Sequence, residues 1–316
     1  LIGEENRGLA CMFTMMNNAR LLVGVQGIGV AEAAFQKALD YARERRQGRA
    51  TRLAKNPEAG GQMSPILDHP DVARMLLTMK SLTGAVRAIT YACGHATDMA
   101  KAHRADAEAS AAWKERANLL TPIAKAFSTD VGVEVASLGI QVHGGMGFVE
   151  ETGAARLLRD ARIAPIYEGT NGIQAIDLVA RKIGQSGGEA VRRYFAELDE
   201  TIEAVRGQNE AAFGETGDAL AAAMADLRET TEFLSNATAA KDMDTALAGA
   251  TPYLRLFGLT AGAVYLAKAA LADTTRTERA HLARFMAENL LSETGALKRQ
   301  VVGGAASLAA AHSILQ

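Results

Sequence analysis

Apolar residues recur at intervals of three and four along most of this 316-residue chain, and this spacing constrains the fold more than any other feature. It places apolar side chains on one face of a helix, whereas a half-buried strand needs strict alternation. Aromatic residues, which favour strands, make up only 5% of the chain, and alanine is frequent. The sequence therefore predicts an all-α protein.

The expected helices of the first half occupy residues 8–46, 70–103, 111–139, 152–162 and a segment after residue 168. Pro122 is expected to break the third of them, because proline inside a helix removes one backbone hydrogen bond. Thr152 is expected to cap the fourth. Gly24, Gly27 and Gly29 lower the helix propensity of the first, so a neighbouring helix or a ligand is expected to approach it closely there.

Two helical bundles are expected, because a chain of this length can support two hydrophobic cores. Residues 185–188 read QSGG and mark a plausible linker, so the first bundle takes residues 1–186 and the second residues 187–316. Helices of the second bundle are expected at residues 190–208, 216–239, 246–272 and 276–314. Residues 51–65, rich in Gly, Pro and Asn, are expected to form a surface loop.

The charge pattern argues against nucleic acid or a membrane as a partner. The formal net charge is −2, and the arginines between residues 43 and 49 are not followed by a basic stripe with interleaved aromatic residues. Neither a bilayer-spanning apolar segment nor a signal peptide is expected. Residues 301–315 are mostly Ala, Gly and Ser, which favours a bundle helix over a membrane-surface helix.

Cysteine and histidine usage bears on metal binding and location. Cys11 and Cys93 lie within apolar helical patterns, which predicts buried thiols rather than a disulfide and fits a reducing cytoplasm. The six histidines are scattered, and no cluster of Cys and His has the spacing of metal ligands. The sequence therefore predicts a cytoplasmic protein without a metal site.

Residues 166–174, IYEGTNGIQ, contain the strongest candidate for a catalytic group. Glu168 lies on a short connector ahead of an amphipathic helix, where Ile166 and Tyr167 place apolar bulk beside the carboxyl group and Gly169 lets the backbone turn. A carboxylate in such surroundings suits a general base. The alternative is a carboxylate that only complements the dipole of the following helix.

Four segments, taken in order, resemble the C-terminal half of the acyl-CoA dehydrogenase family. They are IGEENRGL near the start, NNAR at residues 17–20, ARERRQG ending at residue 48, and QVHGGMGF followed by LLRDARIAPIYEGTNGIQ. The resemblance covers roughly residues 1–183 and implies that the family's N-terminal helical domain and β-domain are missing from this chain. Residues 187–316 resemble the extra C-terminal domain of the larger bacterial members.

The resemblance implies a flavoenzyme that converts an acyl-CoA into a trans-2-enoyl-CoA. Glu168 matches the family's base, which removes the α-proton while the β-hydrogen passes as hydride to N5 of FAD. Some branches place the base on the long helix instead, but the matching residue here is Ala19, which cannot accept a proton. The extra domain suggests 3-methylmercaptopropionyl-CoA, or another short or medium acyl-CoA, as substrate.

The resemblance also assigns substrate-binding residues. Arg20 and Asn17 match positions that hold the CoA moiety, although the family commonly has Asp in place of Asn17. Tyr167 matches a residue that lines the acyl cavity. The alternatives are an ordinary helix salt bridge for Arg20 and a core position for Tyr167.

Further matches concern FAD, part of which the family takes from a neighbouring subunit. The residues assigned in this way are Arg45, Gln47, Gln141, Gly144, Gly145 and Thr170. Arg45 and Gln47 would reach the diphosphate, with Gln47 replacing a Thr or Ser. Thr170 would touch the cofactor of its own subunit. An exposed basic helix end is the alternative for Arg45.

A shared FAD implies a homodimer or homotetramer, with an electron transfer flavoprotein as electron acceptor. The acyl-CoA oxidases share the fold and the base, so an oxidase that uses oxygen stays open. A non-catalytic helical assembly module is the alternative from another class. Because the isoalloxazine packs against the family's β-domain, these residues alone are expected to be inactive.

Overall fold

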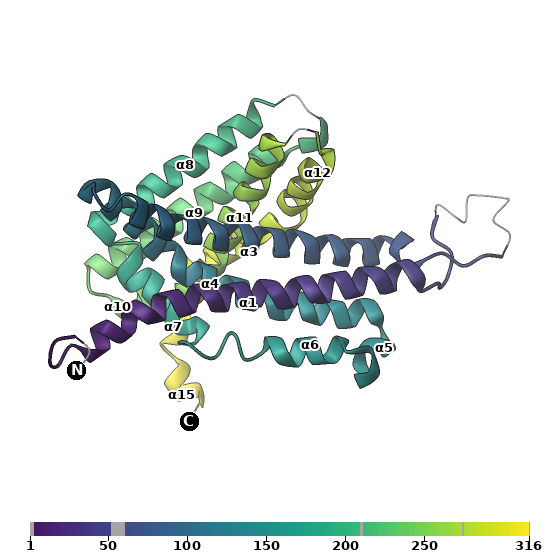
Figure 1. The fold of residues 1–316 in the computed structure, drawn as a ribbon, viewed down its shortest axis with the longest axis horizontal. Coiled ribbons are helices and arrows are strands. Elements are labelled where there is room, and N and C mark those ends of the chain that lie inside the picture. Colours follow the sequence, from purple (N-terminus) through teal and green to yellow (C-terminus); the bar gives the residue numbers. More distant parts are fainter. Residues whose placement is uncertain (1–2, 52–60, 209–210, 274, 316) are drawn as a thin grey trace.

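The computed structural model describes residues 3–51, 61–208, 211–273 and 275–315. Within these ranges the chain is helical and has no β-strand, and its one isolated bridge joins Arg46 to Pro65. The all-α prediction is confirmed (Figure 1). Most of the loop expected at residues 51–65 lies outside the described residues.

Three long helices form the centre of the first half: α1 (Gly8–Glu44), α3 (Pro70–Ala102) and α4 (Ala107–His143). Glycines let α1 approach α4 closely, because a Cβ built on Gly24 would lie 2.4 Å from the Ala124 carbonyl oxygen, and one on Gly27 would lie 2.6 Å from that of Ser128. A Cβ on Gly29 would meet nothing within 4 Å. The expected close approach is therefore confirmed at two of the three glycines.

Pro122 does not break α4, so that prediction was wrong. α4 is one helix of 37 residues with Pro122 inside it, and Pro122 itself is buried. α4 packs against both α1 and α3, and this packing outweighs the single backbone hydrogen bond that proline removes.

Shorter elements connect α4 to the second half: α5 (Gly145–Phe148), α6 (Ala154–Ala161), α7 (Asn171–Asp177) and a π-helical turn (Leu178–Lys182). Thr152 does not cap α6, contrary to expectation. Its hydroxyl donates to the carbonyls of Met146 and Val149, and Gly153 at φ 73° occupies the cap position. The Thr152 hydroxyl is therefore engaged in and before the 3-10 turn Glu150–Thr152 and does not cap α6.

The second half contains α8 (Glu189–Arg206), α9 (Thr216–Ala239), α10 (Met243–Ala248), α11 (Ala250–Ala272), α12 (Thr277–Phe285), α13 (Thr294–Gly303), α14 (Ala305–Leu308) and α15 (Ala311–Leu315). A single helix over residues 276–314 was expected and is wrong, because π and 3-10 turns interrupt it at Met286–Leu290 and Leu291–Glu293. Most described side chains after Val301 are exposed, and α15 projects from the body (Figure 1), so this segment is not a bundle helix.

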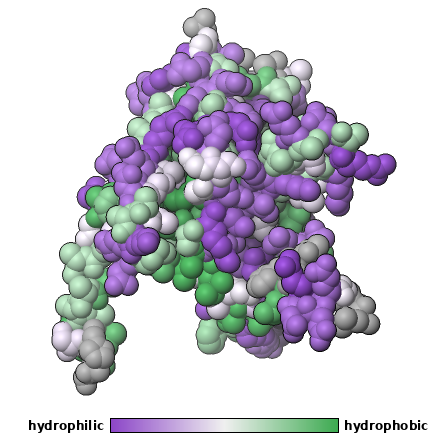
Figure 2. All heavy atoms as spheres, turned by 90° about the vertical axis from the view of Figure 1, so that its left-hand side faces the viewer, coloured by the Kyte–Doolittle hydropathy of each residue, from purple (hydrophilic) through white to green (hydrophobic). Residues whose placement is uncertain are grey.

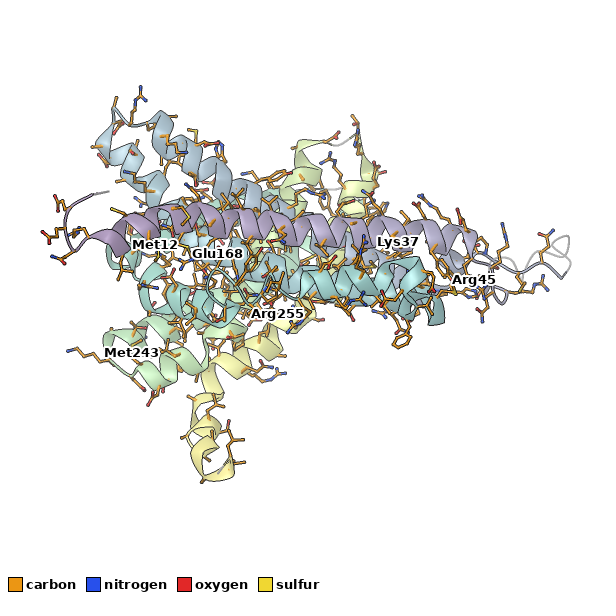
Figure 3. All side chains as sticks on the ribbon, turned by 60° about the horizontal axis from the view of Figure 1, so that its bottom comes forward. Met12, Lys37, Arg45, Glu168, Met243 and Arg255 are labelled. Atoms are coloured by element: carbon orange, nitrogen blue, oxygen red, sulfur yellow. The ribbon has the colours of Figure 1, made fainter. Side chains whose placement is uncertain are left out.

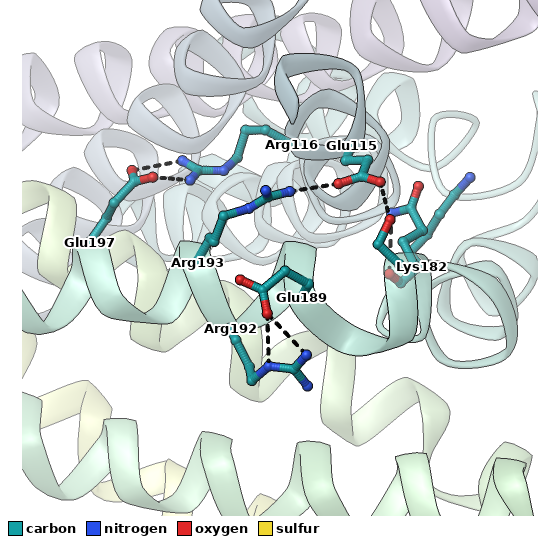
Figure 4. A network of polar contacts seen from close by, with 9 residues as sticks. Glu115, Arg116, Lys182, Glu189, Arg192, Arg193 and Glu197 are labelled. Carbon is teal, nitrogen blue, oxygen red and sulfur yellow. Dashed lines mark hydrogen bonds and ion pairs between the residues drawn. The ribbon is translucent and has the colours of Figure 1, made fainter. Parts of the chain in front are cut away.

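Buried apolar residues of both halves form one continuous cluster, whereas separate cores were expected. α11 packs across α3 and α4, where Gly262 approaches Ala85 and Gly258 approaches Phe127. Two ion pairs also join α4 to α8: Arg116 with Glu197, and Arg193 with Glu115 at 2.7 Å (Figure 4). A boundary at residue 186 stays a prediction, but the two sides of it share their core.

α11 is long and apolar enough to cross a membrane by length and composition, which no segment was expected to be. Of its most apolar window, 67% is buried inside the molecule. Arg255 near its beginning pairs with Glu134 and Glu293 at 3.1 and 2.6 Å. The core helix of a globular bundle meets the same criteria, and α11 occupies such a position.

The two cysteines differ in environment, and both are free thiols. Cys93 is fully buried, as expected, and burial raises the pKa of its thiol to about 11. Cys11 is exposed, contrary to expectation, because the first turns of α1 extend beyond the other helices (Figure 1).

Candidate active site

The connector between α6 and α7 presents Glu168 on a sharp turn. Glu168 has φ 58° and Gly169 has φ 83°, so two successive residues are left-handed. This conformation costs a non-glycine residue about 1–2 kcal/mol, and such strain is typical of functional sites. The φ of 83° favours glycine at the second position, and a Cβ there would also lie 2.9 Å from Nε2 of Gln174, which would have to move.

Backbone bonds brace the connector on both sides of the turn. The Tyr167 amide donates to the Ile163 carbonyl at 3.2 Å, and the Asn171 amide donates to the Pro165 carbonyl at 2.9 Å. The hydroxyl of Tyr167 donates to Gln26 of α1. The hydroxyl of Tyr167 is thus held by α1, and a place for Tyr167 in the acyl cavity stays a prediction.

The Glu168 side chain is half-buried, and its carboxylate has no hydrogen-bond or ion-pair partner within the described ranges. Ile163, Ile166 and Ile173 on either side are 46–52% exposed. Figure 2, which views the molecule from the end where α1 begins, shows hydrophobic atoms gathered in a recess below the centre of that face. An unpaired carboxylate among apolar side chains is free to accept a proton.

Arg20 lies beneath this turn rather than at an open mouth. It is 8% exposed, and its guanidinium is 3.9 Å from the carboxylate of Asp177. Arg181 and Lys182 pair with the same carboxylate at 2.5 and 3.8 Å. The salt-bridge alternative thus describes its observed contact, although Nε of Arg20 is buried without a hydrogen-bond partner. The four-residue spacing of Asp177 and Arg181 was the sequence signal for this cluster.

Asn17, one turn before Arg20, opens onto a cavity of about 660 Å³ between α1, α3 and α4. The lining contains three cationic side chains, those of Lys101, Arg104 and Lys114, and no carboxylate. The ends of α3 and α4 bring these cations together although they are separated in sequence. Sequence reasoning identified Asn17 and missed the three cations.

Lys125 of α4 is a further residue that sequence reasoning missed. Its side chain is fully buried, and Nζ donates to the Gly169 carbonyl at 2.9 Å and to Oδ1 of Asn171 at 2.8 Å. Burial lowers the pKa of its ammonium to about 8, with Arg20 acting in the same direction and Asp130 and Glu168 opposing it. Its position in the apolar run IAKAF was the available signal.

The residues assigned to the FAD diphosphate and adenosine lie at the other end of α1: Figure 3 labels Arg45 there, and His143, next to Gly144, stacks on Tyr41 with ring centroids 4.5 Å apart. From Arg20 to the end of α1 at Glu44, 24 residues rise by about 36 Å. The group comprises Arg45, Gln47, Gln141, Gly144 and Gly145, and its side chains are exposed. Thr170 is apart from it, because its hydroxyl oxygen caps α7 by accepting from the Ile173 amide at 3.3 Å.

The distant group has the features of an anion site. Gly144 has φ 60°, and a Cβ built on Gly144 or Gly145 would meet nothing within 4 Å, so the turn is open on its outer side. The Arg45 guanidinium has no partner among the residues that the structure describes. The backbone carbonyl oxygen of Gln47 lies 2.8 Å from Nε2 of His69, and the side chain of Gln47 is exposed. An exposed guanidinium and an open glycine turn at the same end of α1 fit a diphosphate.

Two family models match the chain. "Acyl-CoA dehydrogenase, C-terminal domain" matches residues 6–184, and "Acetyl-CoA dehydrogenase C-terminal like" matches residues 194–312. The chain belongs to the acyl-CoA dehydrogenase family. The resemblance inferred from the four sequence segments is therefore confirmed.

Known members of the acyl-CoA dehydrogenase fold extend beyond this chain. It is 45% identical over 288 residues to 3-methylmercaptopropionyl-CoA dehydrogenase of Ruegeria pomeroyi, which is 90% of this chain and 47% of that protein. An acyl-CoA dehydrogenase complexed with FAD from Bacillus anthracis matches with a TM-score of 0.70 and 18% identity, over 95% of this chain and 50% of the other. Acyl-CoA oxidase1 from Yarrowia lipolytica matches with a TM-score of 0.67 and 15% identity, over 94% of this chain and 47% of the other. The chain spans about half the length of these proteins.

Proposed function

We propose that this chain supplies the catalytic base of a flavin-dependent acyl-CoA dehydrogenase. The Glu168 carboxylate takes the α-proton of the acyl-CoA thioester, and the β-hydrogen leaves with its electron pair, so that a trans-2-enoyl-CoA forms. Bound FAD supplies the hydride acceptor, N5. The observation that carries this proposal is the unpaired Glu168 carboxylate on a strained left-handed turn among apolar side chains.

The cavity beside Asn17 is proposed to receive the phosphates of CoA. Its three cations and its amide and hydroxyl groups offer donors, and no carboxylate opposes an anion there. Arg20 would contribute to binding of the CoA moiety from beneath the turn. The proposed substrate is 3-methylmercaptopropionyl-CoA or another short or medium acyl-CoA, because the relative named for the first of these is 45% identical across both halves of the chain.

The proposed enzyme is a homo-oligomer, either a dimer or a tetramer. Glu168 and Arg45 are separated by most of the length of α1, too far for one FAD to reach both in a single copy. A second copy that places its Arg45 end near Glu168 of the first would complete each site. In this arrangement Thr170 and Arg45 contact the same FAD from different subunits, as the family resemblance implies.

The test uses the full-length protein, kept anaerobic and mixed with a panel of acyl-CoAs. We expect the flavin absorption to bleach with the preferred acyl-CoA. The Glu168→Gln variant should retain flavin, but its rate of bleaching should fall by a factor on the order of 10³ or more, which is what a general base contributes. Glu200→Gln, an exposed carboxylate on α8, is the matched control and should bleach like the wild type. A Glu168→Gln variant that bleaches normally would contradict the assignment.

Two further outcomes separate the alternatives. Stoichiometric hydrogen peroxide during aerobic turnover would identify an oxidase, whereas rapid reduction of an electron transfer flavoprotein would identify a dehydrogenase. A full-length protein that holds neither flavin nor acyl-CoA would favour the assembly module. A cytoplasmic location belongs to the same proposal and is tested by cell fractionation.

A further inference from the structure

Lys125 is a buried cation whose two hydrogen bonds end on the segment that carries Glu168. A buried ammonium is costly unless strong partners offset the loss of water. Its partners here are the Gly169 carbonyl at 2.9 Å and Oδ1 of Asn171 at 2.8 Å. Gly169 directly follows Glu168, and Asn171 is the third residue after it.

Asn171 is held so that its oxygen faces the lysine. Its amide nitrogen donates to the Ala126 carbonyl at 3.1 Å, to Oγ1 of Thr129 at 2.9 Å and to Oδ1 of Asp130 at 2.7 Å. Its two N–H groups share these three acceptors and fix the orientation of the amide, so that Oδ1, which only accepts, faces Lys125 and the Thr129 hydroxyl, 3.3 Å away. The lysine therefore binds a preoriented pair of oxygens, one at each side of Thr170.

Backbone bonds close the connector from Pro165 to Asn171, but among the described side chains few reach the two carbonyls of the turn itself. Gln174 is the remaining side chain on the carbonyls of Glu168 and Gly169, and its Nε2 lies 3.4 Å from each. Those bonds are long, whereas the bonds from a charged donor are short and about twice as strong as neutral ones. Lys125 thus makes the shorter of the two described side-chain contacts to the Gly169 carbonyl, and the charged one.

We propose that Lys125 is a positioning residue for Glu168: through the Gly169 carbonyl it fixes the left-handed turn and thereby the direction of the Glu168 carboxylate toward the substrate. This inference rests on the proposed function of Glu168. It goes beyond that function because Lys125 touches neither substrate nor flavin and acts only through the connector. A misplacement of about 1 Å in a reacting group can lower a rate by about 100-fold.

The experiment isolates the proton step in the flavin-loaded full-length protein. A 3-thia-acyl-CoA, with sulfur in place of the β-carbon, has no β-hydrogen to give, so washout of deuterium from its α-carbon into water reports only removal and return of the α-proton. We expect Lys125→Met, which keeps side-chain length and removes donor and charge, to slow washout on the order of 100-fold while changing the Kd of the thioester by no more than about threefold.

Thr231→Val is the matched control, because it removes a buried hydrogen bond, 2.7 Å long to Tyr253, far along the sequence in the second half. If Lys125→Met slows washout no more than this control does, or if the loss lies in thioester affinity alone, Lys125 has only a structural role and the inference is overturned. Wild type without any washout overturns the function of Glu168, and this inference with it. Wild type and Lys125→Met with equal washout overturn only the inference.

The wild type supplies a second test should Lys125→Met fail to fold. The groups that act on Lys125 are Asp130 of the same helix, Arg20 of α1 and Glu168 of the connector, and burial keeps the pKa of its ammonium near 8 rather than 10.5. Above pH 8 the neutral amine makes weaker bonds to Gly169 and Asn171, so washout should fall roughly tenfold. Over the same range this group makes folding more favourable, because only the unfolded chain still binds the proton.

Washout that falls between pH 7 and 9 while the melting temperature is constant or rises is the expected result. A purely structural lysine would not move the washout in that direction. A pH-independent washout over this range would overturn the inference.

Discussion

At the residue scale, the cavity beside Asn17 shows how side chains from separate helices gain a common role. Lys101 lies in the last turn of α3, Arg104 follows the end of that helix, and Lys114 lies near the start of α4. Each is an ordinary exposed cation by itself. Together they line one cavity without a carboxylate, which favours an anionic ligand.

The first prediction concerns that cavity. Lys114→Glu should raise the KM for acyl-CoA by roughly 10-fold while kcat changes little, because a cation near the CoA phosphates is replaced by an anion. Added salt should reduce the difference by screening. Steady-state kinetics at two ionic strengths measure both effects. Lys268→Glu, at an exposed position of α11, is the control, and an equal rise in KM for both variants would remove the cavity from the proposal.

Side-chain partners were the least accessible feature at this scale. The residue pattern identified Glu168 and Gly169, because a left-handed turn needs glycine and a base needs a carboxylate. It did not show that Thr152 bonds to earlier carbonyls, or that Arg20 pairs with Asp177. Those contacts depend on which side chains the folded backbone brings within about 4 Å.

At the scale of elements, the contact between α1 and α4 is set by small residues. A Cβ on Gly27 would meet the Ser128 carbonyl at 2.6 Å, and Gly132 of α4 faces Gly27 in turn. The two backbones therefore touch at this crossing. Pro122 and its neighbours stay helical because the same packing holds α4 on both sides.

The second prediction uses two glycines of α1 as a matched pair. Gly27→Ala should lower the free energy of unfolding by about 1–3 kcal/mol, since two backbones must separate to admit the methyl group. Gly29→Ala should leave it unchanged or raise it by up to about 1 kcal/mol, since the site is open and alanine is the better helix former. Chemical denaturation of both variants provides the comparison. Equal destabilisation by the two would mean that α1 and α4 do not touch at Gly27.

At the scale of the whole molecule, the candidate site is divided between two ends. Glu168 lies in one half of the long helical layer, and Arg45 lies at its far end (Figure 3). Closed symmetry lets a second copy bring the two ends together at two equivalent sites.

The third prediction is complementation between two inactive variants of the full-length protein. Glu168→Gln and Arg45→Glu should each lose turnover, but subunit exchange should restore about a quarter of the wild-type activity, because half of the dimers are mixed and each mixed dimer has one intact site. Turnover of the two pure variants and of their mixture is measured after the same exchange procedure. Activity that stays at the level of the pure variants would mean that both residues serve one site within one copy.

The sequence by itself determined the all-α class, the positions of the long helices and the candidate base. These follow from local spacing: apolar residues every three or four positions, and a glycine next to a carboxylate ahead of a helix. The order of four motifs also determined the family.

Only the tertiary structure decided that both halves share one core, that Lys125 holds the turn of Glu168, and that the proposed FAD contacts lie about 36 Å along α1 from Arg20. Residues 125 and 169 are joined by a hydrogen bond although they are distant in sequence. The packing of helices determines which of the many possible pairs of distant residues meet. The burial that gives Lys125 its lowered pKa arises from the same packing, because desolvation requires neighbours on every side.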